Sequence, residues 1–334
     1  MVTKKDIAKI AGVSPATVSN FFNGKKKMST DTQNKILQAA SELDYYPDRK
    51  NLSPFTSRKN IFLVVDDIFN PHYAHILNGM QKVASQHSLF VSMLPIWNNI
   101  DEFCNSVIDA NPIAIYFAFK RSVLSEFQIN LLESHNIMLF FSWENFEIDF
   151  DELISKAVKY LLDLGHTRIA YLSGLSINSP DNVRYLSYQN ALRANNLEFD
   201  CNLVIDGVYP YETTAKYGYW SVTSFLKKKV NFTAMIALND LLAIGAINAL
   251  TENGLSIPGD VSVIGCDNIM ISENFNPPLT TLKISATDMG CQIMFAIVRK
   301  LNQPDLEISP IKLQTELIIR KTTGGANTQQ NNQI

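Results

Sequence analysis

The sequence is poor in cysteine and has no long hydrophobic run. Its four cysteines stand far apart along the 334 residues, and none belongs to a CxxC pair, so nothing indicates a disulfide framework or a zinc site. No apolar run approaches the roughly 20 residues that a membrane helix needs, and the first residues contain no hydrophobic signal-peptide core. We therefore expect a cytoplasmic protein with reduced thiols, no membrane contact, no metal and no cofactor.

The sequence also lacks the short motifs of common enzyme classes. It contains no P-loop, no GxSxG, no HExxH and no GxGxxG after a predicted strand. The five histidines are scattered, and although His72 and His75 are three residues apart, no companion metal ligand is evident. The protein is therefore not expected to be an enzyme.

Charge is unevenly distributed along the chain, although the net charge is only −3. Residues 1–60 hold eleven basic and five acidic residues, a net of +6, whereas the remainder holds 18 basic and 27 acidic residues, a net of −9. A small basic module on a larger acidic body indicates a polyanion partner for the N-terminal end. A solvated, charged arm explains the charge alone equally well.

The first 22 residues carry the signals of a short helix, a tight turn and a second helix. Thr3 and Asp6 have the spacing of a capping box, and Gly12 stands where a left-handed residue would end the first helix. Ser14 can cap the second helix, and Pro15 takes its first position, where the missing N–H costs nothing. The residues predicted to face the core are Ile7, Ile10, Ala11, Val18, Phe21 and Phe22.

The second helix is predicted to end at Asn23 and Gly24. A third helix is predicted to start at Ser29 and to end before Tyr45, because Pro47 disfavours helix in the residue that precedes it. Two short helices joined by a glycine-containing turn and braced by a third form a helix-turn-helix, whose second helix reads base edges in the major groove of DNA. Any three-helix bundle with similar caps is the alternative. The inward residues of the third helix are predicted to be Ile36, Leu37, Ala40 and Leu43.

From residue 60 onward, short apolar runs alternate with helical stretches, which predicts βαβ units and parallel sheets. Eight strands are too many for one doubly wound subdomain and fit two of them. Ligands are expected at the carboxyl ends of the strands. The predicted strands are 61–65, 90–94, 113–119, 137–141, 169–173, 203–206, 234–238 and 261–265. The predicted helices include 73–87, 150–164, 183–195, 213–228 and 240–253.

Motifs along the whole chain resemble those of the lactose/galactose repressor family of bacterial transcription regulators. They are VTKKDIAKIAGVSPATVSNFFNG and MSTDTQNKILQAASELDYYP near the N-terminus, then NIFLVVDDIFNPHYAHILNGM, LLDLGHTRIAYLSG, MIALNDLLAIGAINAL, IPGDVSVIGCDN and NPPLTTLKIS. The resemblance covers residues 2–324. It implies an α/β protein in which an N-terminal all-α helix-turn-helix domain precedes a two-lobed, doubly wound parallel-sheet (periplasmic-binding-protein-like) effector domain.

The resemblance also implies domain boundaries. The DNA-binding domain would span 1–47, the hinge linker 48–60 and the effector domain 61–324. Within the effector domain, the N-lobe would comprise about 61–144 and 285–306, and the C-lobe about 145–284 and 307–324. Residues 325–334 are rich in Asn and Gln and are expected to form a disordered tail.

The same resemblance assigns residues to DNA binding. Asn20 matches a base-reading position where the family usually has arginine or histidine, and since asparagine favours adenine while arginine favours guanine, the operator sequence is open there. Lys25 lies in the loop after the recognition helix and is expected to touch phosphate, with a solvated loop as the alternative. The other residues assigned to DNA binding are Pro15 and Ala16 for base reading, Thr3, Ser14, Thr17 and Ser19 for phosphates, and Asn23.

Residues 48–60 have the polar, basic composition of a linker. The family has a short hinge helix there, which wedges an apolar side chain, usually leucine, into the minor groove. Pro54 stands where that leucine is expected. Leu52 is therefore assigned as the wedge, with Phe55, or the absence of a hinge helix, as the alternatives.

Three polar residues are expected to contact an effector. Arg184 matches an arginine that clamps the effector in the family, and its fork suits sugar hydroxyls or a carboxylate; a surface salt bridge is the alternative. Asp267 matches the family aspartate that accepts hydrogen bonds from the effector. Asp267 and Asn239 each lie at the carboxyl end of a predicted strand, and either could instead cap a helix.

Four aromatic residues complete the expected effector site. His72, Tyr73 and Tyr209 match aromatic contact positions of the family. Trp143 falls near a position usually filled by aspartate, where it could stack on the apolar face of a sugar ring or simply belong to the core.

Together these features predict a repressor controlled by a small molecule. A homodimer would bind a pseudo-palindromic double-stranded DNA operator, and the effector would shift the population of two lobe arrangements. The mixture of polar and aromatic residues predicts a sugar effector and a carbohydrate-utilisation operon. The alternatives are a purine- or nucleoside-responsive repressor, or a solute-binding protein without DNA function.

Overall fold

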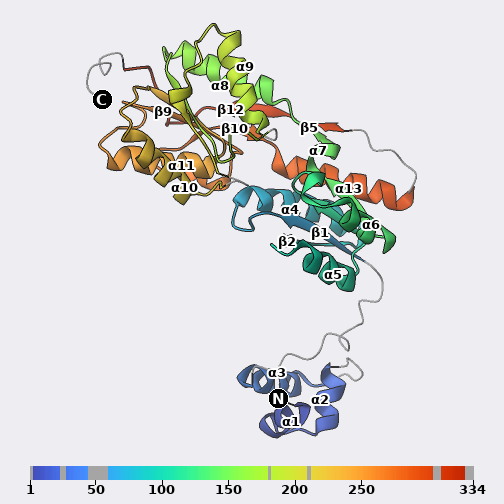
Figure 1. The fold of residues 1–334 in the computed structure, drawn as a ribbon. Helices are drawn as coiled ribbons and strands as arrows, with labels where there is room; N and C mark the ends of the chain where they lie inside the picture. The colour runs from blue at the N-terminus through green and yellow to red at the C-terminus, as the bar shows by residue number, and fades with distance from the viewer. Residues whose placement is uncertain are drawn as a thin grey trace. The chain divides into compact units, whose positions relative to one another are not determined.

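The computed structural model describes residues 3–22, 28–43, 59–179, 182–208, 212–303 and 310–327. The chain forms two compact units, residues 1–59 and 60–334, which are described separately (Figure 1). None of the helices in this described part combines the length and the hydrophobicity that crossing a bilayer would require.

The smaller unit is helical in its described residues, as predicted. Its elements are α1 (Lys4–Ala11), α2 (Pro15–Phe22) and α3 (Thr30–Glu42). The Asp6 carboxylate accepts hydrogen bonds from the backbone N–H and the hydroxyl of Thr3, at 2.8 and 2.7 Å. Gly12 ends α1 with a left-handed φ of 64°. These contacts confirm the predicted start and end of α1.

The core of this unit takes one fully buried side chain from each helix, namely Ile7, Val18 and Ile36. The prediction that Ile10 also faces the core is wrong, because 49% of Ile10 is exposed. Successive helical residues turn by about 100°. The buried stripe therefore runs through Ile7, Ala8 and Ala11, which leaves Ile10 beside the stripe rather than on it.

The larger unit begins with a parallel four-stranded sheet in the order β2-β1-β3-β4. This sheet and its helices are called the N-lobe. The strands are β1 (Asn60–Val65), β2 (Phe90–Pro95), β3 (Ala114–Phe117) and β4 (Met138–Phe141). The helices are α4 (Pro71–Ala84), α5 (Ile100–Ala110), α6 (Glu126–Ser134) and α13 (Ala286–Asn302).

Helices α4 and α13 are far apart in the sequence but lie side by side (Figure 1). A Cβ atom on Gly79 of α4 would overlap the carbonyl oxygen of Thr287, and one on Gly290 of α13 would overlap that of Ile76. The two helix backbones therefore touch at this crossing, and only glycine fits at either position.

The second sheet has six strands in the order β12-β10-β9-β8-β6-β7. This sheet and its helices are called the C-lobe. The strands are β6 (Ile169–Leu172), β7 (Val204–Ile205), β8 (Ala234–Ala237), β9 (Ser262–Cys266), β10 (Thr280–Ile284) and β12 (Thr315–Ile318). The helices are α8 (Phe150–Asp163), α9 (Val183–Ala194), α10 (Ala215–Leu226), α11 (Asp240–Glu252) and α12 (Met270–Asn274).

The chain passes between the lobes by way of the segments before α8, before α13 and after α13. The first segment contains α7 (Ser142–Asn145) and β5 (Phe146–Glu147), and the third contains β11 (Ile311–Lys312). β5 and β11 pair in parallel, so two of the crossovers run together. The predicted α/β architecture, a helix-turn-helix followed by a two-lobed body, is confirmed.

One strand runs against the predicted direction. The sequence predicted parallel sheets, but β12 is antiparallel to β10. The chain leaves the C-lobe after β10 and forms α13 in the N-lobe before it re-enters. Because it returns from the side on which it left, the returning strand has the opposite direction.

Candidate functional site

A cavity of about 620 Å³ lies between the N-lobe and the C-lobe. This volume is within the range of small-molecule sites in proteins. Five of the residues predicted to contact an effector line it. His72 and Tyr73 come from the start of α4, and Arg184, Asn239 and Asp267 come from the C-lobe.

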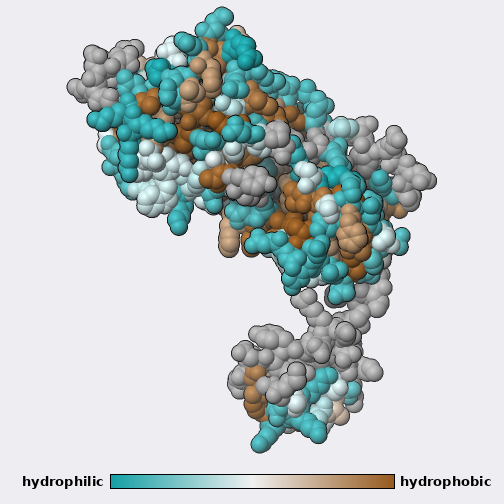
Figure 2. Space-filling model, viewed as in Figure 1, coloured by the Kyte–Doolittle hydropathy of each residue, from teal (hydrophilic) through white to brown (hydrophobic). Residues whose placement is uncertain are grey.

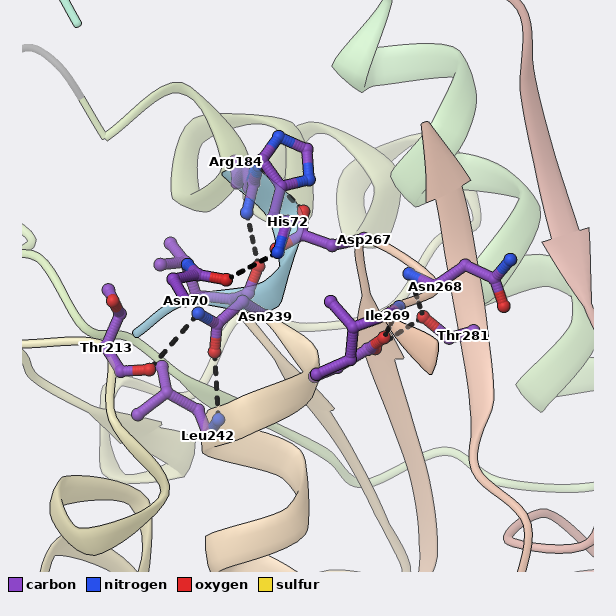
Figure 3. A network of polar contacts seen from close by, with 12 residues as sticks. Asn70, His72, Arg184, Thr213, Asn239, Leu242, Asp267, Asn268, Ile269 and Thr281 are labelled. Carbon is purple, nitrogen blue, oxygen red and sulfur yellow. Dashed lines mark hydrogen bonds and ion pairs between the residues drawn. The ribbon is translucent and has the colours of Figure 1, made fainter. Parts of the chain in front are cut away.

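Arg184 and Asp267 form an ion pair in the cavity wall (Figure 3). The guanidinium donates through Nη1 to the carbonyl oxygen of Leu238 at 2.5 Å, and Nη2 lies 3.5 Å from Asp267 Oδ1. It also lies 5.0 Å from the centre of the Phe150 ring. Only 22% of the Arg184 side chain and 7% of the Asp267 side chain are exposed. The ion pair is thus inside the cavity, which argues against the surface salt bridge considered for Arg184.

The backbone at Asp267 is in an unusual conformation. Its φ is 108° and that of the following Asn268 is 53°, both in the left-handed region that favours glycine. A non-glycine residue held there costs about 1–3 kcal/mol, and such residues cluster at functional sites. The conformation turns the chain immediately after β9 and places the Asp267 side chain on the cavity wall.

Asn239 acts as the N-cap of α11. Its Oδ1 accepts a hydrogen bond from the Leu242 N–H at 2.8 Å, and its Nδ2 donates to the Thr213 carbonyl oxygen at 3.2 Å. Only 3% of the residue is exposed. The capping role that the sequence left open is therefore observed, at a position that also lines the cavity.

His72 and Tyr73 contribute two rings from the opposite lobe, edge to face at a centroid distance of 5.6 Å. Asn70 accepts from the His72 N–H at 3.0 Å and starts the helix. His72 Nδ1 is buried and has no hydrogen-bond partner within the described part of the chain. Burial lowers the pKa of His72 below its usual value of 6.5, so the ring is neutral at pH 7 and presents an uncommitted polar atom.

Two predicted effector residues are not placed. Tyr209 lies outside the described residues. The backbone of Trp143 belongs to α7, but its side chain is outside what the structure describes. The cavity has further lining residues that the sequence did not single out, namely Asp66, Asn70, Phe119, Lys120, Ser142 and Phe150.

On the helix-turn-helix, Pro15 and Ala16 are exposed at the start of α2, while Thr17, Ser19 and Asn20 are half-buried. Ser14 Oγ accepts a hydrogen bond from the Thr17 N–H at 3.0 Å, so Ser14 caps α2 as predicted. The hydroxyl of Thr3, another assigned phosphate contact, donates to Asp6. The remaining residues assigned to DNA binding, Asn23, Lys25 and Leu52, lie outside the described residues, as do Pro54 and Phe55.

Comparisons with known proteins cover both units of the chain. Residues 3–48 match the family model of bacterial regulatory proteins of the lacI family, and residues 158–323 match that of a periplasmic binding protein-like domain. The "HTH-type transcriptional repressor PurR" of Histophilus somni strain 129Pt is 31% identical over 339 residues, covering 96% of this chain and 99% of the relative.

Solved structures show the same fold. A lacI-family transcriptional regulator from Enterococcus faecium with bound ribose has a TM-score of 0.70 at 24% identity, covering 80% of this chain and all of the other. A sugar-binding transcriptional regulator of the lacI family from Escherichia coli, complexed with phosphate, has a TM-score of 0.63 at 25% identity, covering 81% and 100%.

Proposed function

The chain belongs to the lacI family of bacterial regulatory proteins, and we propose that it is a transcription repressor whose operator affinity is set by a purine base or nucleoside. The observation that carries the proposal is the cavity between the lobes, lined by the Arg184–Asp267 pair and by His72. The family consists of DNA-binding transcription regulators rather than enzymes, which fits the absence of catalytic motifs from the sequence.

The operator-binding surface is proposed to be the exposed side of α2. Pro15, Ala16 and Asn20 would read bases, and Thr3, Ser14, Thr17 and Ser19 would hold phosphates. Lys25 and Asn23 would extend this contact, and Leu52 would enter the minor groove. With asparagine at position 20, adenine is the favoured base at the contacted position. The protein would act where its DNA lies, in the cytoplasm.

The purine assignment rests on the full-length relative. Its name, PurR, suggests a purine-responsive repressor, and the sequence had left that class of effector open. The cavity offers what a purine edge would need, since Asp267 accepts hydrogen bonds, Arg184 donates them, and neutral His72 can do either according to its tautomer. Phe119 and Tyr73 would pack beside the flat ring.

A sugar is the second candidate and is the effector that the sequence predicted. It is supported by the mixed polar and aromatic lining of the cavity and by the Escherichia coli neighbour described as sugar-binding. A carboxylate beside a guanidinium can hold neighbouring hydroxyls of a sugar ring. In that case the regulated genes would belong to carbohydrate utilisation.

We further propose a homodimer, matching a pseudo-palindromic operator with a two-fold axis. Several large apolar side chains of the larger unit are exposed, including Phe69, Trp220 and Met270. On the face of the molecule drawn in Figure 2, hydrophobic residues lie at the surface among hydrophilic ones. A second copy of the chain is the partner that we propose to cover part of this exposed apolar surface.

Isothermal titration calorimetry tests the effector. Guanine, hypoxanthine, adenine and inosine are compared with ribose and glucose. We expect a purine to bind and Arg184→Ala to weaken it about tenfold or more, because a hydrogen bond to a charged group contributes about 1.5–3 kcal/mol. Arg193→Ala is the matched control, since Arg193 lies on the same helix but is exposed. If the sugars bind and none of the purines does, the effector is a sugar, the second candidate. A purine bound equally well by Arg184→Ala would contradict the site.

A further inference from the structure

Asp240 is a fully buried carboxyl group beside the cavity but not in its lining. It is the first residue of α11 and directly follows the capping Asn239. A Cβ atom added to Gly265 of β9 would overlap Asp240 Oδ1, so the carboxylate is pressed against the neighbouring strand. An ionisable group in such a place needs hydrogen bonds to offset the loss of water.

Three donors meet this carboxylate. Oδ2 accepts from the Ile269 backbone N–H at 2.9 Å and from the Ser272 hydroxyl at 2.6 Å. Oδ1 accepts from the Thr281 hydroxyl of β10. The donors come from the segment after β9, from α12 and from β10. Asp240 thus ties α11 to the segment that carries Asp267.

The same network reaches Asn268, the second of the two left-handed residues at the end of β9 (Figure 3). Thr281 Oγ1, which donates to Asp240, accepts from the Asn268 N–H at 3.3 Å. The Asp267 N–H donates to the Leu282 carbonyl oxygen at 2.8 Å. Residues 267, 268 and 269 are therefore each held by a backbone N–H. Asp240 accepts one of these bonds directly and supports a second through Thr281.

We propose that Asp240 is a positioning residue for effector binding, because it holds the strained turn that aims Asp267 into the cavity. Strained conformations persist only where the surroundings over-determine them, and among those surroundings the Asp240 carboxylate accepts the bonds from Ile269 and Thr281. Without it, Asp267 relaxes out of the left-handed region, and its carboxylate leaves the place where it meets Arg184 and the effector. The part concerning affinity rests on the proposed function, whereas the part concerning the turn does not.

The test uses Asp240→Asn, Thr281→Val and the control Thr233→Val in the full-length protein at pH 8. All three replacements conserve side-chain shape. Asp240→Asn replaces one of the two accepting carboxylate oxygens by an NH₂ group, which cannot accept a hydrogen bond. Thr281→Val removes the hydroxyl that links Asp240 to the Asn268 N–H. Thr233→Val removes the partner of buried His166 at the opposite end of β8. It is a comparable polar loss in the same lobe.

Hydrogen exchange measured by mass spectrometry reports the turn without any ligand. We expect Asp240→Asn to speed exchange of the Ile269 amide and Thr281→Val to speed exchange of the Asn268 amide, each about tenfold, as for the loss of one hydrogen bond. Thr233→Val should leave both amides unchanged. Unchanged exchange at both amides in both variants would overturn the proposal, whatever happens to the melting temperature.

Calorimetry then measures affinity with guanine, hypoxanthine, adenine, inosine and ribose as probes. A probe that binds the native protein is expected to bind Asp240→Asn and Thr281→Val about tenfold more weakly, with Thr233→Val unchanged. Faster exchange with undiminished affinity would show that the turn is held for stability alone and would overturn the positioning role. If none of the probes binds the native protein, the proposed effector class fails, while the exchange result still decides whether Asp240 holds the turn.

Discussion

At the scale of single residues, buried ionisable groups distinguish this protein's C-lobe from an ordinary apolar core. Burial raises the pKa of Asp240 to about 7, with a further contribution from the Asp267 carboxylate, while the bonds from Ser272, Thr281 and Ile269 oppose the rise. The hydrogen bonds therefore offset only part of the cost of ionisation. A carboxyl group in this state titrates near neutral pH, unlike an exposed aspartate.

This pKa predicts how the stability of the larger unit depends on pH. The folded pKa is raised above the ordinary value of 3.8, so the unfolded chain loses this proton first as pH rises. The protonated Asp240 contributes to the free energy of unfolding fully below about pH 4, and this contribution is lost as pH rises through about 7. Its upper bound is about 4 kcal/mol, at 1.36 kcal/mol for each unit by which the pKa is raised. We expect urea unfolding of the native protein, compared with Asp240→Asn, to show this extra decline between pH 5 and pH 8. Parallel pH profiles for the two proteins would contradict it.

Sequence patterns reached some of these residues and missed others. Asp267 was predicted from its match to a family aspartate and its place at the end of a predicted strand, and Asn239 from its place at the end of another. Both signals are local in the sequence. Asp240 stands next to Asn239 in an otherwise apolar stretch, which was an available signal. Its partners, however, are up to 41 residues away in the sequence, and no periodicity reveals them. The ring of Phe150 under Arg184 was likewise hidden, since a phenylalanine at a helix start reads as core.

At the scale of secondary-structure elements, close helix packing is set by glycine. Helices α4 and α13 touch through Gly79 and Gly290, and α10 and α11 repeat the arrangement through Gly218 and Gly245, whose added Cβ atoms would overlap backbone atoms of the partner helix. Each lobe therefore has one helix pair in which backbones meet without intervening side chains. α4 also begins with the cavity residues His72 and Tyr73, so the packing of this pair fixes one wall of the site.

Replacing Gly79 by alanine is expected to destabilise the larger unit. The new methyl group would force α4 away from α13, a form of overpacking that costs about 1–3 kcal/mol. Gly325→Ala is the matched control, because nothing lies within 4 Å of a Cβ atom there. Thermal unfolding should show a lower melting temperature for Gly79→Ala only. Equal melting temperatures would mean that the helices separate without cost.

Alternating apolar and helical segments predicted most strands and helices because these signals are local. The strand β1 and the helix α8 match their predicted ranges to within one residue. The direction of β12 was missed because it depends on where the chain goes between two strands, and Ile10 was misplaced because three residues at helical spacing do not fix the centre of a buried stripe. Tertiary contacts decide both.

At the scale of the whole molecule, the protein joins a DNA-binding unit to a body with a cavity between two lobes. Three crossovers connect the lobes, and ligand atoms that touch both Arg184 and His72 would favour one arrangement of the lobes over another. Effector and operator would then influence each other's binding by the same factor, as linkage requires. A coupling of about 1–3 kcal/mol corresponds to a change in affinity of about 5- to 150-fold.

The most direct test is the operator affinity with and without effector. Fluorescence anisotropy on DNA from upstream of the protein's own gene is measured for the native protein, Arg184→Ala and Arg193→Ala, with the purine or sugar that calorimetry identifies. At an effector concentration that does not saturate Arg184→Ala, the account predicts a change in operator affinity of at least about fivefold for the native protein and for Arg193→Ala. It predicts a much smaller change for Arg184→Ala, which should still bind DNA. An operator affinity that the bound effector leaves unaltered in the native protein, or alters equally in Arg184→Ala, would contradict it.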